Sequence, residues 1–349
     1  MWKKYLLYGI GAIMMLLTAC NKEDDELSAT DVVNWFAIPD RPGELGHLLH
    51  DIYRETGISI FINDTLGVSG EVTDAHGNPV KRYETVSEKY LIYNSLKDDI
   101  RFVLSADTAA ILKAVQTIEK WVIPNLASSG EYRPKSLLLV DSLLWGVYGG
   151  DTIRKGGGTA WVFNKSIETT PVGKLADIKT MDEPTLKFWA GMVVSPKVKE
   201  WLENYCADSL SIFYKMANSD LPSRSYSLYN LTSYFYLEVI DTGEKISTED
   251  RYYGADFWDY WRMGFLEWVD SEWEKIMEEN LKRVYRKTPD KNCDVMNYIA
   301  AVYAFSDAEF EAMFEGVEYS EKCIKKRLYM KDLVKIFEDA NGITRQPFN

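Results

Sequence analysis

The sequence predicts an α+β fold in which a mixed α/β lobe over residues 31–180 is followed by a mainly helical lobe over residues 181–349. Two observations lead to this class. In the first lobe, short apolar runs bounded by turn residues alternate with amphipathic helical patterns. From about Met181 onward, apolar residues recur at helical spacing almost to the end of the chain. Mixed elements followed by a run of helices are typical of α+β proteins.

The first residues predict a secretory leader that ends at a lipid-carrying cysteine. Lys3 and Lys4 precede an apolar run over residues 5–17, which is shorter than the roughly 20 residues that cross a membrane. The quartet Leu-Thr-Ala-Cys at residues 17–20 resembles the lipobox of bacterial lipoproteins. That resemblance implies cleavage after residue 19 and acylation of Cys20, including palmitate, which joins the chain to a membrane. An ordinary signal peptide or an uncleaved anchor is the alternative.

Residues 20–30 predict an acidic, flexible tether, because the run Asn-Lys-Glu-Asp-Asp-Glu at 21–26 has nothing apolar to bury. This run resembles the acidic export tag that follows the lipid cysteine in surface lipoproteins of the Bacteroides group. The resemblance implies an outer-membrane protein that faces the cell exterior, with the periplasmic face as the other case.

Net charge and cysteine content argue against nucleic acid as a partner and against disulfide or zinc crosslinks. The formal charge of −13 argues against nucleic acid, which is bound through basic surfaces. Besides Cys20, the chain has Cys206, Cys293 and Cys323, without a C-x-x-C pair. Neither a zinc knuckle nor a disulfide framework is indicated, and we expect free thiols.

In the mixed lobe, each element is predicted from its apolar period and its boundary residues. Ser105 is the expected N-cap of the second helix and Pro124 its end. The predicted elements, in order, are a helix at 44–56, a strand at 58–62, a hairpin at 68–86, a helix at 105–121, a strand at 136–144, a glycine-rich hairpin loop at 149–158 and a strand at 159–164. In the second lobe, helices are predicted at 183–204, 207–217, 255–285, 292–304, 307–315 and 320–340.

Histidine is scarce, which limits the chemistry available. The three histidines, His47, His50 and His76, lie in the first quarter of the chain. His47 and His50 are three residues apart on a predicted helix and could face one metal ion, but no third ligand is evident nearby. We expect them to be surface residues. The glycine-rich loop lacks the Gly-Lys-Ser/Thr order of a phosphate-binding loop, because Lys155 comes before its glycine run.

An acidic and aromatic stretch over residues 249–272 offers candidate ligand-binding residues. Asp256 and Asp259 lie among Glu267, Asp270 and Glu272, and a pair of these carboxylates could serve a glycosidase. Trp258, Trp261, Phe265 and Trp268 recur at helical spacing. Core packing is the simpler interpretation of this stripe, and a sugar-stacking platform that includes Trp258 and Trp261 is the alternative.

The chain resembles the lipid-anchored zinc metallopeptidases of Bacteroides-type bacteria, a zincin-like family, over roughly residues 45–345. The resemblance rests on the order and texture of several segments, which are His-Asp-Ile-Tyr-Arg-Glu-Thr-Gly-Ile-Ser-Ile at 50–60, Arg-Pro-Lys-Ser-Leu-Leu-Leu-Val at 133–140, Asn-Cys-Asp-Val-Met-Asn-Tyr at 292–298 and Phe-Glu-Asp-Ala-Asn-Gly-Ile at 337–343. It implies one bilobal zincin-like domain.

In that family a helix after the glycine-rich segment contains His-Glu-x-x-His, whose histidines bind zinc while the glutamate acts on the bound water. The corresponding positions here are Phe188, Trp189 and Met192, and a later acidic position becomes Asn297. None of the three helix residues can perform its counterpart's role. The resemblance therefore implies a fold without its metal, cofactor or catalytic residues.

These inferences predict a surface lipoprotein that binds rather than catalyses. The expected setting is an outer-membrane nutrient-uptake system, with a neighbouring transporter or lipoprotein as partner and a peptide or a glycan as ligand. The alternative is a glycosidase or peptidase that uses an unrelated acidic site around residues 249–272.

Overall fold

The computed structural model describes residues 33–86, 98–147, 153–155, 169–217, 229, 232–239, 245–247, 260–267, 269–278, 281–318 and 320–348. The chain divides into two compact units, Met1–Phe36 and Ala37–Asn349. In the first unit, Phe36 N–H donates to Asn34 Oδ1 at 3.1 Å in a short turn. The predicted leader and tether lie outside the described residues. Within the described ranges, no helix is both long and apolar enough to cross a membrane.

The second unit has an α+β fold, in which a five-stranded sheet is built around the long strand β5 (Ser136–Val147). The first residues of β5 pair in parallel with β1 (Ser59–Phe61) and with β7 (Thr169–Val172). Its later residues pair antiparallel with β4 (Asp98–Leu104) and with β6 (Ile153–Lys155). Leu137 to Val140 are buried, as expected of a central strand with both faces covered.

Two helical segments of the first lobe confirm their predictions, with one correction. Helix α2 (Glu44–Thr56) ends at Gly57, whose φ of 73° is the left-handed conformation typical of a helix C-cap. Helix α3 (Thr108–Thr117) continues into a π-helical turn η2 (Ile118–Val122) and a 3₁₀ turn η3 (Ile123–Asn125). The predicted cap at Ser105 is wrong, because Asp107 accepts from the backbone N–H of Ala109 and Ala110.

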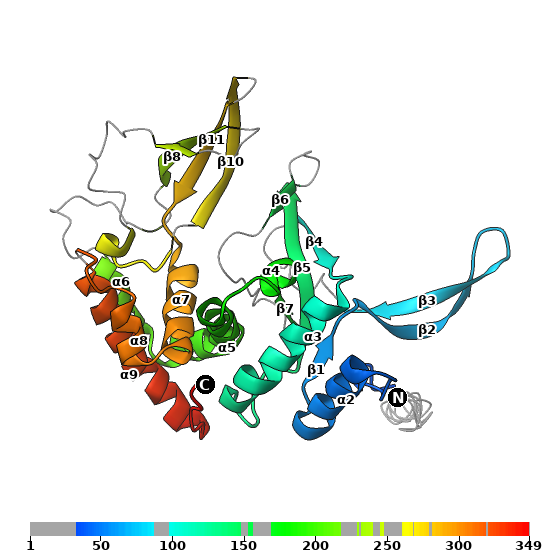
Figure 1. Ribbon diagram of the computed structural model, residues 1–349. Helices are drawn as coiled ribbons and strands as arrows, with labels where there is room; N and C mark the ends of the chain where they lie inside the picture. The colour runs from blue at the N-terminus through cyan, green and yellow to red at the C-terminus, as the bar shows by residue number, and fades with distance from the viewer. Residues whose placement is uncertain are drawn as a thin grey trace, which may run out of the picture. The chain divides into compact units, whose positions relative to one another are not determined.

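The predicted hairpin is confirmed as β2 (Thr65–Thr73) and β3 (Pro79–Thr85). The Asp74 carboxylate closes the turn by accepting from the backbone N–H of His76 and Asn78, both at 2.8 Å. Gly77 has a φ of 85°, which glycine adopts readily. Nearly every residue of the two strands is exposed, and Figure 1 shows the hairpin as an arm.

Helices of the second lobe form at the predicted places, and each begins and ends within a few residues of its predicted bounds. They follow the short helix α4 (Leu175–Ile178) and are α5 (Glu183–Tyr205), α6 (Ala207–Ala217), α7 (Lys291–Ala304), α8 (Asp307–Ala312) and α9 (Glu321–Asn341). Side-chain caps explain three of their starts. Asp182 caps α5, Asp290 caps α7, and Ser306 with Glu309 forms a capping box at α8.

The helix predicted over residues 255–285 is wrong. A 3₁₀ turn η5 (Tyr260–Met263) ends at Gly264, whose φ of 81° a continuing helix does not allow. Strands β10 (Val269–Glu278) and β11 (Leu281–Lys287) follow, and they join β8 (Thr232–Val239) and β9 (Lys245–Ser247) in a four-stranded sheet of order β10-β11-β8-β9. The second lobe is therefore helical with an antiparallel sheet inserted between α6 and α7.

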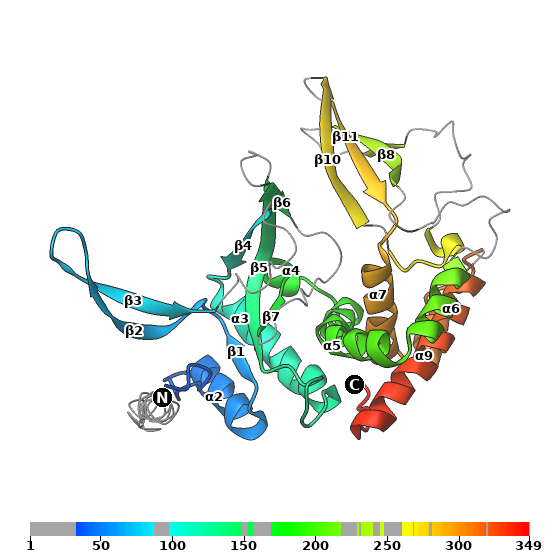
Figure 2. The same ribbon diagram turned by 180° about the vertical axis from the view of Figure 1, so that it is seen from behind.

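The main core is one cluster that runs from Leu49 to Phe348 and so includes buried residues of both predicted lobes. At its centre α5 crosses α7, and both views of the ribbon show the two helices side by side (Figures 1 and 2). The crossing is close because Gly191 has no side chain. A Cβ atom built at this glycine would lie 2.5 Å from the carbonyl oxygen of Ala300.

Candidate functional site

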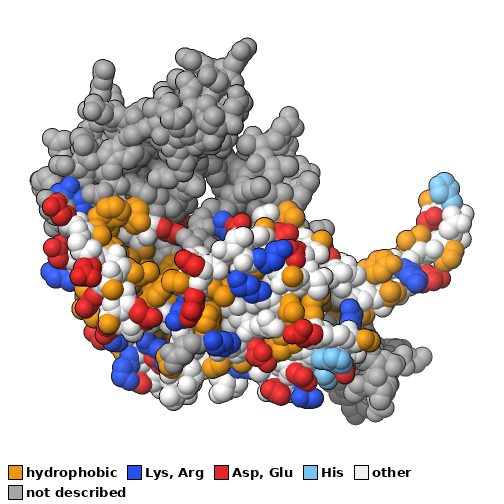
Figure 3. Space-filling view, viewed as in Figure 1, with side chains coloured by type: hydrophobic (Ala, Val, Ile, Leu, Met, Phe, Trp, Pro, Cys, Tyr) orange, Lys and Arg blue, Asp and Glu red, His pale blue; other side chains and the backbone are white. Residues whose placement is uncertain are grey.

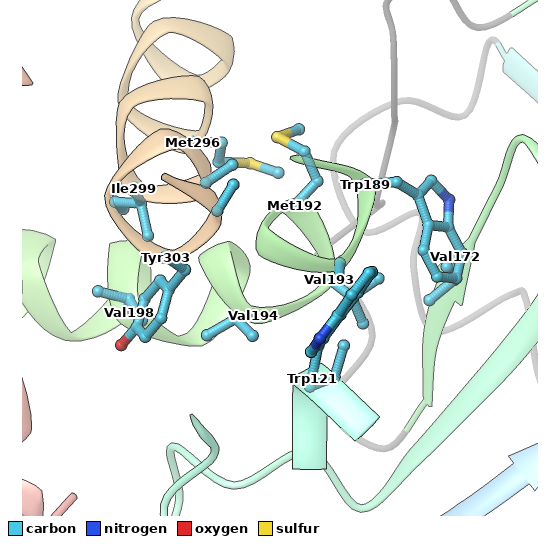
Figure 4. Close-up of a cluster of buried hydrophobic side chains, with 14 of the residues drawn as sticks. Trp121, Val172, Trp189, Met192, Val193, Val194, Val198, Met296, Ile299 and Tyr303 are labelled. Carbon is cyan, nitrogen blue, oxygen red and sulfur yellow. The ribbon is translucent and has the colours of Figure 1, made fainter. Parts of the chain in front are cut away.

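The middle of α5 is buried on all sides. Two of the positions singled out in the sequence, Trp189 and Met192, therefore lie inside the core. Trp189 and Met192 are 0% and 3% exposed. In the close-up of the core, Met192 points toward Met296 of α7, while Trp189 lies beside Val172 of β7 (Figure 4). The Trp189 indole N–H donates to the carbonyl oxygen of Gly173 at 2.9 Å. Both side chains therefore pack in the core, and the polar group of Trp189 is satisfied there.

Phe188 differs from these two residues because it lines a pocket. Its ring stacks on Phe305 with centroids 6.4 Å apart. The pocket has a volume of about 290 Å³ and receives residues from the start of α5, from η5 and the loop after it, from α7 and from α8 with the turn that follows it. Apolar side chains gather on this face of the molecule (Figure 3). We call this cavity the aromatic pocket. The aromatic residues that line it are Phe188, Tyr260, Phe305, Phe310 and Phe314.

One carboxylate stands in the wall of the aromatic pocket. Glu267 is the one charged side chain among those described residues that line it. The Asn297 Nδ2 group donates to Glu267 Oε1 at 3.0 Å, and the Cys293 thiol approaches the same oxygen at 4.0 Å. Asn297, the fourth position singled out in the sequence, therefore orients this carboxylate from α7. Its own Oδ1 is buried and has no hydrogen-bond partner among the described residues.

The thiol beside this carboxylate is unsuited to nucleophilic chemistry. Burial raises the pKa of Cys293 well above its ordinary value, and the negative charges of Glu267 and Asp290 raise it further. Since the thiolate is the reactive form, the neutral thiol is inert at neutral pH. Cys206, Cys293 and Cys323 are all free thiols, as predicted.

Behind the pocket, the loop after η5 is held by a buried ion pair. Lys326 Nζ donates to Asp294 at 2.7 and 2.9 Å and to the carbonyl oxygen of Gly264 at 2.7 Å. The Tyr229 hydroxyl donates to Asp294 Oδ2 at 2.7 Å. Burial raises the pKa of Asp294 and lowers the pKa of Lys326. Because Leu266 and Glu267 are only two and three residues after Gly264, this network holds one wall of the pocket in place.

The predicted acidic and aromatic site is described only in part. Asp256, Asp259 and Trp258 lie outside the described residues. Trp261 belongs to η5, where its ring meets Tyr260 edge to face with centroids 4.8 Å apart. Its Nε1 is buried, and no described residue hydrogen-bonds to it. The expected helical stripe does not form, because η5 ends before Phe265. Glu267 remains as the acidic residue that the structure brings to a pocket.

In the described structure, each histidine has at most one other potential metal ligand beside it. His47 Nδ1 lies 2.6 Å from Asp40 Oδ1 on an exposed surface, and His50 Nδ1 lies 2.8 Å from the carbonyl oxygen of Ile38. His76 is in the turn of the hairpin. Among the residues that the structure describes, no group of three or more His, Cys, Asp or Glu side chains could hold a metal ion.

Sequence reasoning missed the pocket as a site. Its lining comes from segments that are more than 70 residues apart, such as Phe188 and Tyr260. One local signal was available, since Phe310 and Phe314 are four residues apart among acidic residues on α8 and the turn after it. Comparisons with protein-family models, with curated proteins and with solved structures found no match.

Proposed function

We propose that the protein is a lipid-anchored, surface-exposed lipoprotein that binds a ligand without catalysis, as an accessory protein of an outer-membrane nutrient-uptake system. In this proposal the lipid is attached at Cys20, the fold is a zincin-like one that has lost its metal site, and a neighbouring transporter or lipoprotein is the partner. The ligand is a peptide or a glycan fragment that enters the aromatic pocket.

The observation that supports the binding role most is that the side chains in the middle of α5 are apolar and packed. Phe188 forms a pocket wall, whereas Trp189 and Met192 are packed in the core. A phenyl ring has no lone pair for a metal, a thioether is a poor ligand for Zn²⁺, and an indole cannot take a proton from water. A metallopeptidase site at this helix would need three different side chains. Phe188 instead helps to line a mainly apolar cavity, which is the usual form of a ligand site.

A fluorescent probe tests the binding role directly. We expect N-phenyl-1-naphthylamine, a neutral aromatic dye, to bind the mature protein with a rise in its emission. Met313→Trp should weaken this binding severalfold, because Met313 lines the pocket and is 51% exposed, so a larger ring can block the cavity without disturbing the core. The matched control is Ile336→Trp on α9, where the replaced side chain is 49% exposed and does not line the pocket. Equal binding by both variants, or none by the unmodified protein, would contradict the proposal.

The alternative function is a hydrolase that uses the acidic stretch around residues 249–272. The observation that favours it is Glu267, a carboxylate in a pocket wall. Glycosidases need a second carboxylate across the substrate, and Asp256 and Asp259 are the candidates. Hydrolysis of aryl glycosides or of peptides that is abolished by Glu267→Gln would support this alternative, and intact substrate after long incubation would count against it.

A further inference from the structure

We infer that the aromatic pocket binds one large apolar side chain of a peptide whose neighbouring residues are basic. This inference rests on the proposed function, because it selects the peptide rather than the glycan as the ligand of the same pocket. Two observations carry it. They are the chemistry of the pocket lining and a pair of acidic residues, next to lining residues in the chain, that have no basic partner among the described residues.

The lining of the aromatic pocket favours an apolar group over a sugar. Among the described residues that line it, only Thr185, Tyr260 and Glu267 have polar side chains. A sugar ring has hydroxyl groups around its rim, and each one that is buried without a hydrogen bond costs free energy. A phenyl or branched aliphatic side chain has no such group to satisfy and gains from leaving water. The pocket therefore suits an apolar side chain of a peptide.

The size of the cavity limits which part of a peptide it admits. Its volume of about 290 Å³ lies at the lower end of ligand pockets, so it has room for one side chain. The walls are already in place, since Phe305 and Phe310 are buried. The Arg327 guanidinium lies 4.9 Å from the ring centroid of Phe310 and donates to Asp307 at 2.6 Å. Because only one side chain enters, the residues before and after it must lie on the protein surface around the pocket.

Part of that surface is acidic. The segment over residues 307–318 supplies three of the lining residues, and it contains five acidic residues and no Lys or Arg. Glu311 and Glu315 are exposed, and no described residue forms an ion pair with either side chain. A basic residue next to the apolar one in a peptide is therefore attracted here. This attraction does not depend on Glu267, whose Oε1 atom accepts from Asn297 inside the pocket wall.

Two other acidic residues of this segment already have partners within the protein. Asp307 accepts from Arg327, and Glu309 caps α8 and lies 3.8 Å from Lys187. Lys187 precedes Phe188 in the chain, and its charge is also offset by Glu183 at 3.3 Å. The positive charges of this region are thus compensated, whereas the negative charges of the acidic segment are compensated only in part.

Four probes test this inference by calorimetry on the purified full chain at low salt. Three are peptides with acetylated and amidated ends, Gly-Lys-Phe-Lys-Gly, Gly-Lys-Ala-Lys-Gly and Gly-Glu-Phe-Glu-Gly, and the fourth is maltotriose. We expect the Lys-Phe-Lys peptide to bind at least about tenfold more tightly than the Lys-Ala-Lys peptide, because its ring leaves water. It should bind at least about threefold more tightly than the Glu-Phe-Glu peptide. High salt should remove the second preference and keep the first, and maltotriose should not bind.

Variants separate the two parts of the inference. Met313→Trp, which blocks the cavity, should remove the advantage of the phenylalanine peptide over the alanine peptide. Glu311→Gln combined with Glu315→Gln should remove the preference for lysine over glutamate and leave binding of the neutral dye unchanged. The matched control is Glu119→Gln combined with Asp332→Asn, which removes two exposed acids that do not line the pocket, and it should keep the preference.

Several results would overturn the inference while leaving the pocket as a binding site. They are equal binding of the phenylalanine and alanine peptides, equal binding of the lysine and glutamate peptides at low salt, and a preference for lysine that survives in the Glu311 and Glu315 double variant. Displacement of the dye by maltotriose, or by none of the four probes, would overturn it as well. Failure of all probes, including the neutral dye, would overturn the proposed function too.

Discussion

At the scale of single residues, Asn297 holds the carboxylate in the wall of the aromatic pocket. Its amide donates to Glu267 at 3.0 Å, whereas a carboxylate at the same position would place two negative charges in contact. The sequence did not indicate Glu267 as its partner, because Glu267 is 30 residues away and strands β10 and β11 lie between the two residues.

Asn297→Asp is expected to destabilise the protein by about 1–3 kcal/mol at pH 7, because a hydrogen bond is replaced by repulsion between a buried carboxylate at position 297 and the half-buried carboxylate of Glu267. Repulsion raises the pKa of such a pair in the folded state, so the loss is largest above that pKa and shrinks as the pH falls and one carboxyl takes up a proton. Urea unfolding at pH 7 and pH 5 measures this difference, with the exposed Asn204→Asp as control. An equal loss at both pH values would contradict the prediction.

The ion pair of Lys326 and Asp294 gives a second prediction at this scale. Both side chains are buried, at 0% and 1% exposed, so removing one leaves an uncompensated charge. Lys326→Met alone should cost about 3–5 kcal/mol of unfolding free energy, and the double variant with Asp294→Asn should regain much of it. Denaturation of the two single variants and the double variant measures the coupling. Additive losses would show that the pair does not act as a unit.

At the scale of elements, local signals predicted most helices and failed where tertiary structure decides. Helices α2, α5, α7 and α9 have apolar periods bounded by capping or breaking residues, which act within a few positions of the chain. The stretch at 255–285 also shows helical spacing of Trp258, Trp261 and Phe265, yet Gly264 interrupts it and strands β10 and β11 follow. Strand pairing with β8, more than 40 residues away, could not be deduced from that local pattern.

The crossing of α5 and α7 predicts the effect of a glycine substitution. Alanine is favoured over glycine within a helix by about 1 kcal/mol. At Gly191, however, the new methyl group would lie 2.5 Å from the Ala300 carbonyl oxygen, which belongs to the backbone and cannot turn aside. We therefore expect Gly191→Ala to destabilise the protein by about 1–3 kcal/mol. Thermal unfolding tests this, with Gly70→Ala in the exposed hairpin as control, where a Cβ atom has no neighbour within 4 Å. A stabilised Gly191 variant would show that the helices can separate at no cost.

At the scale of the whole molecule, the sequence predicted the α+β class, which the structure confirms. It could not show the aromatic pocket, because Phe188, Glu267 and Phe310 come together only when α5, the loop after η5 and α8 are packed on α7. The single core that joins both predicted lobes likewise depends on packing between distant segments. A pattern in one segment holds no information about its tertiary neighbours.

The proposed anchoring concerns the whole molecule, since it decides where the body is held. Cys20→Ser should abolish incorporation of a radiolabelled fatty acid and move the protein from the membrane fraction to the soluble fraction. Cys206→Ser should change neither, because this thiol lies in the body at the end of α5. Unchanged membrane association of the Cys20 variant would indicate an uncleaved leader as the anchor.

The most direct test asks whether α5 holds a zinc peptidase site. The mature protein is titrated with Zn²⁺ by calorimetry, and peptide hydrolysis is then assayed with and without a chelator. We expect no tight, stoichiometric uptake of zinc and no hydrolysis that chelator removes, because Phe188, Trp189 and Met192 offer neither a zinc-binding nitrogen nor a general base. One zinc ion bound tightly per chain, with proteolysis that a chelator abolishes and Zn²⁺ restores, would contradict a binding function for this site.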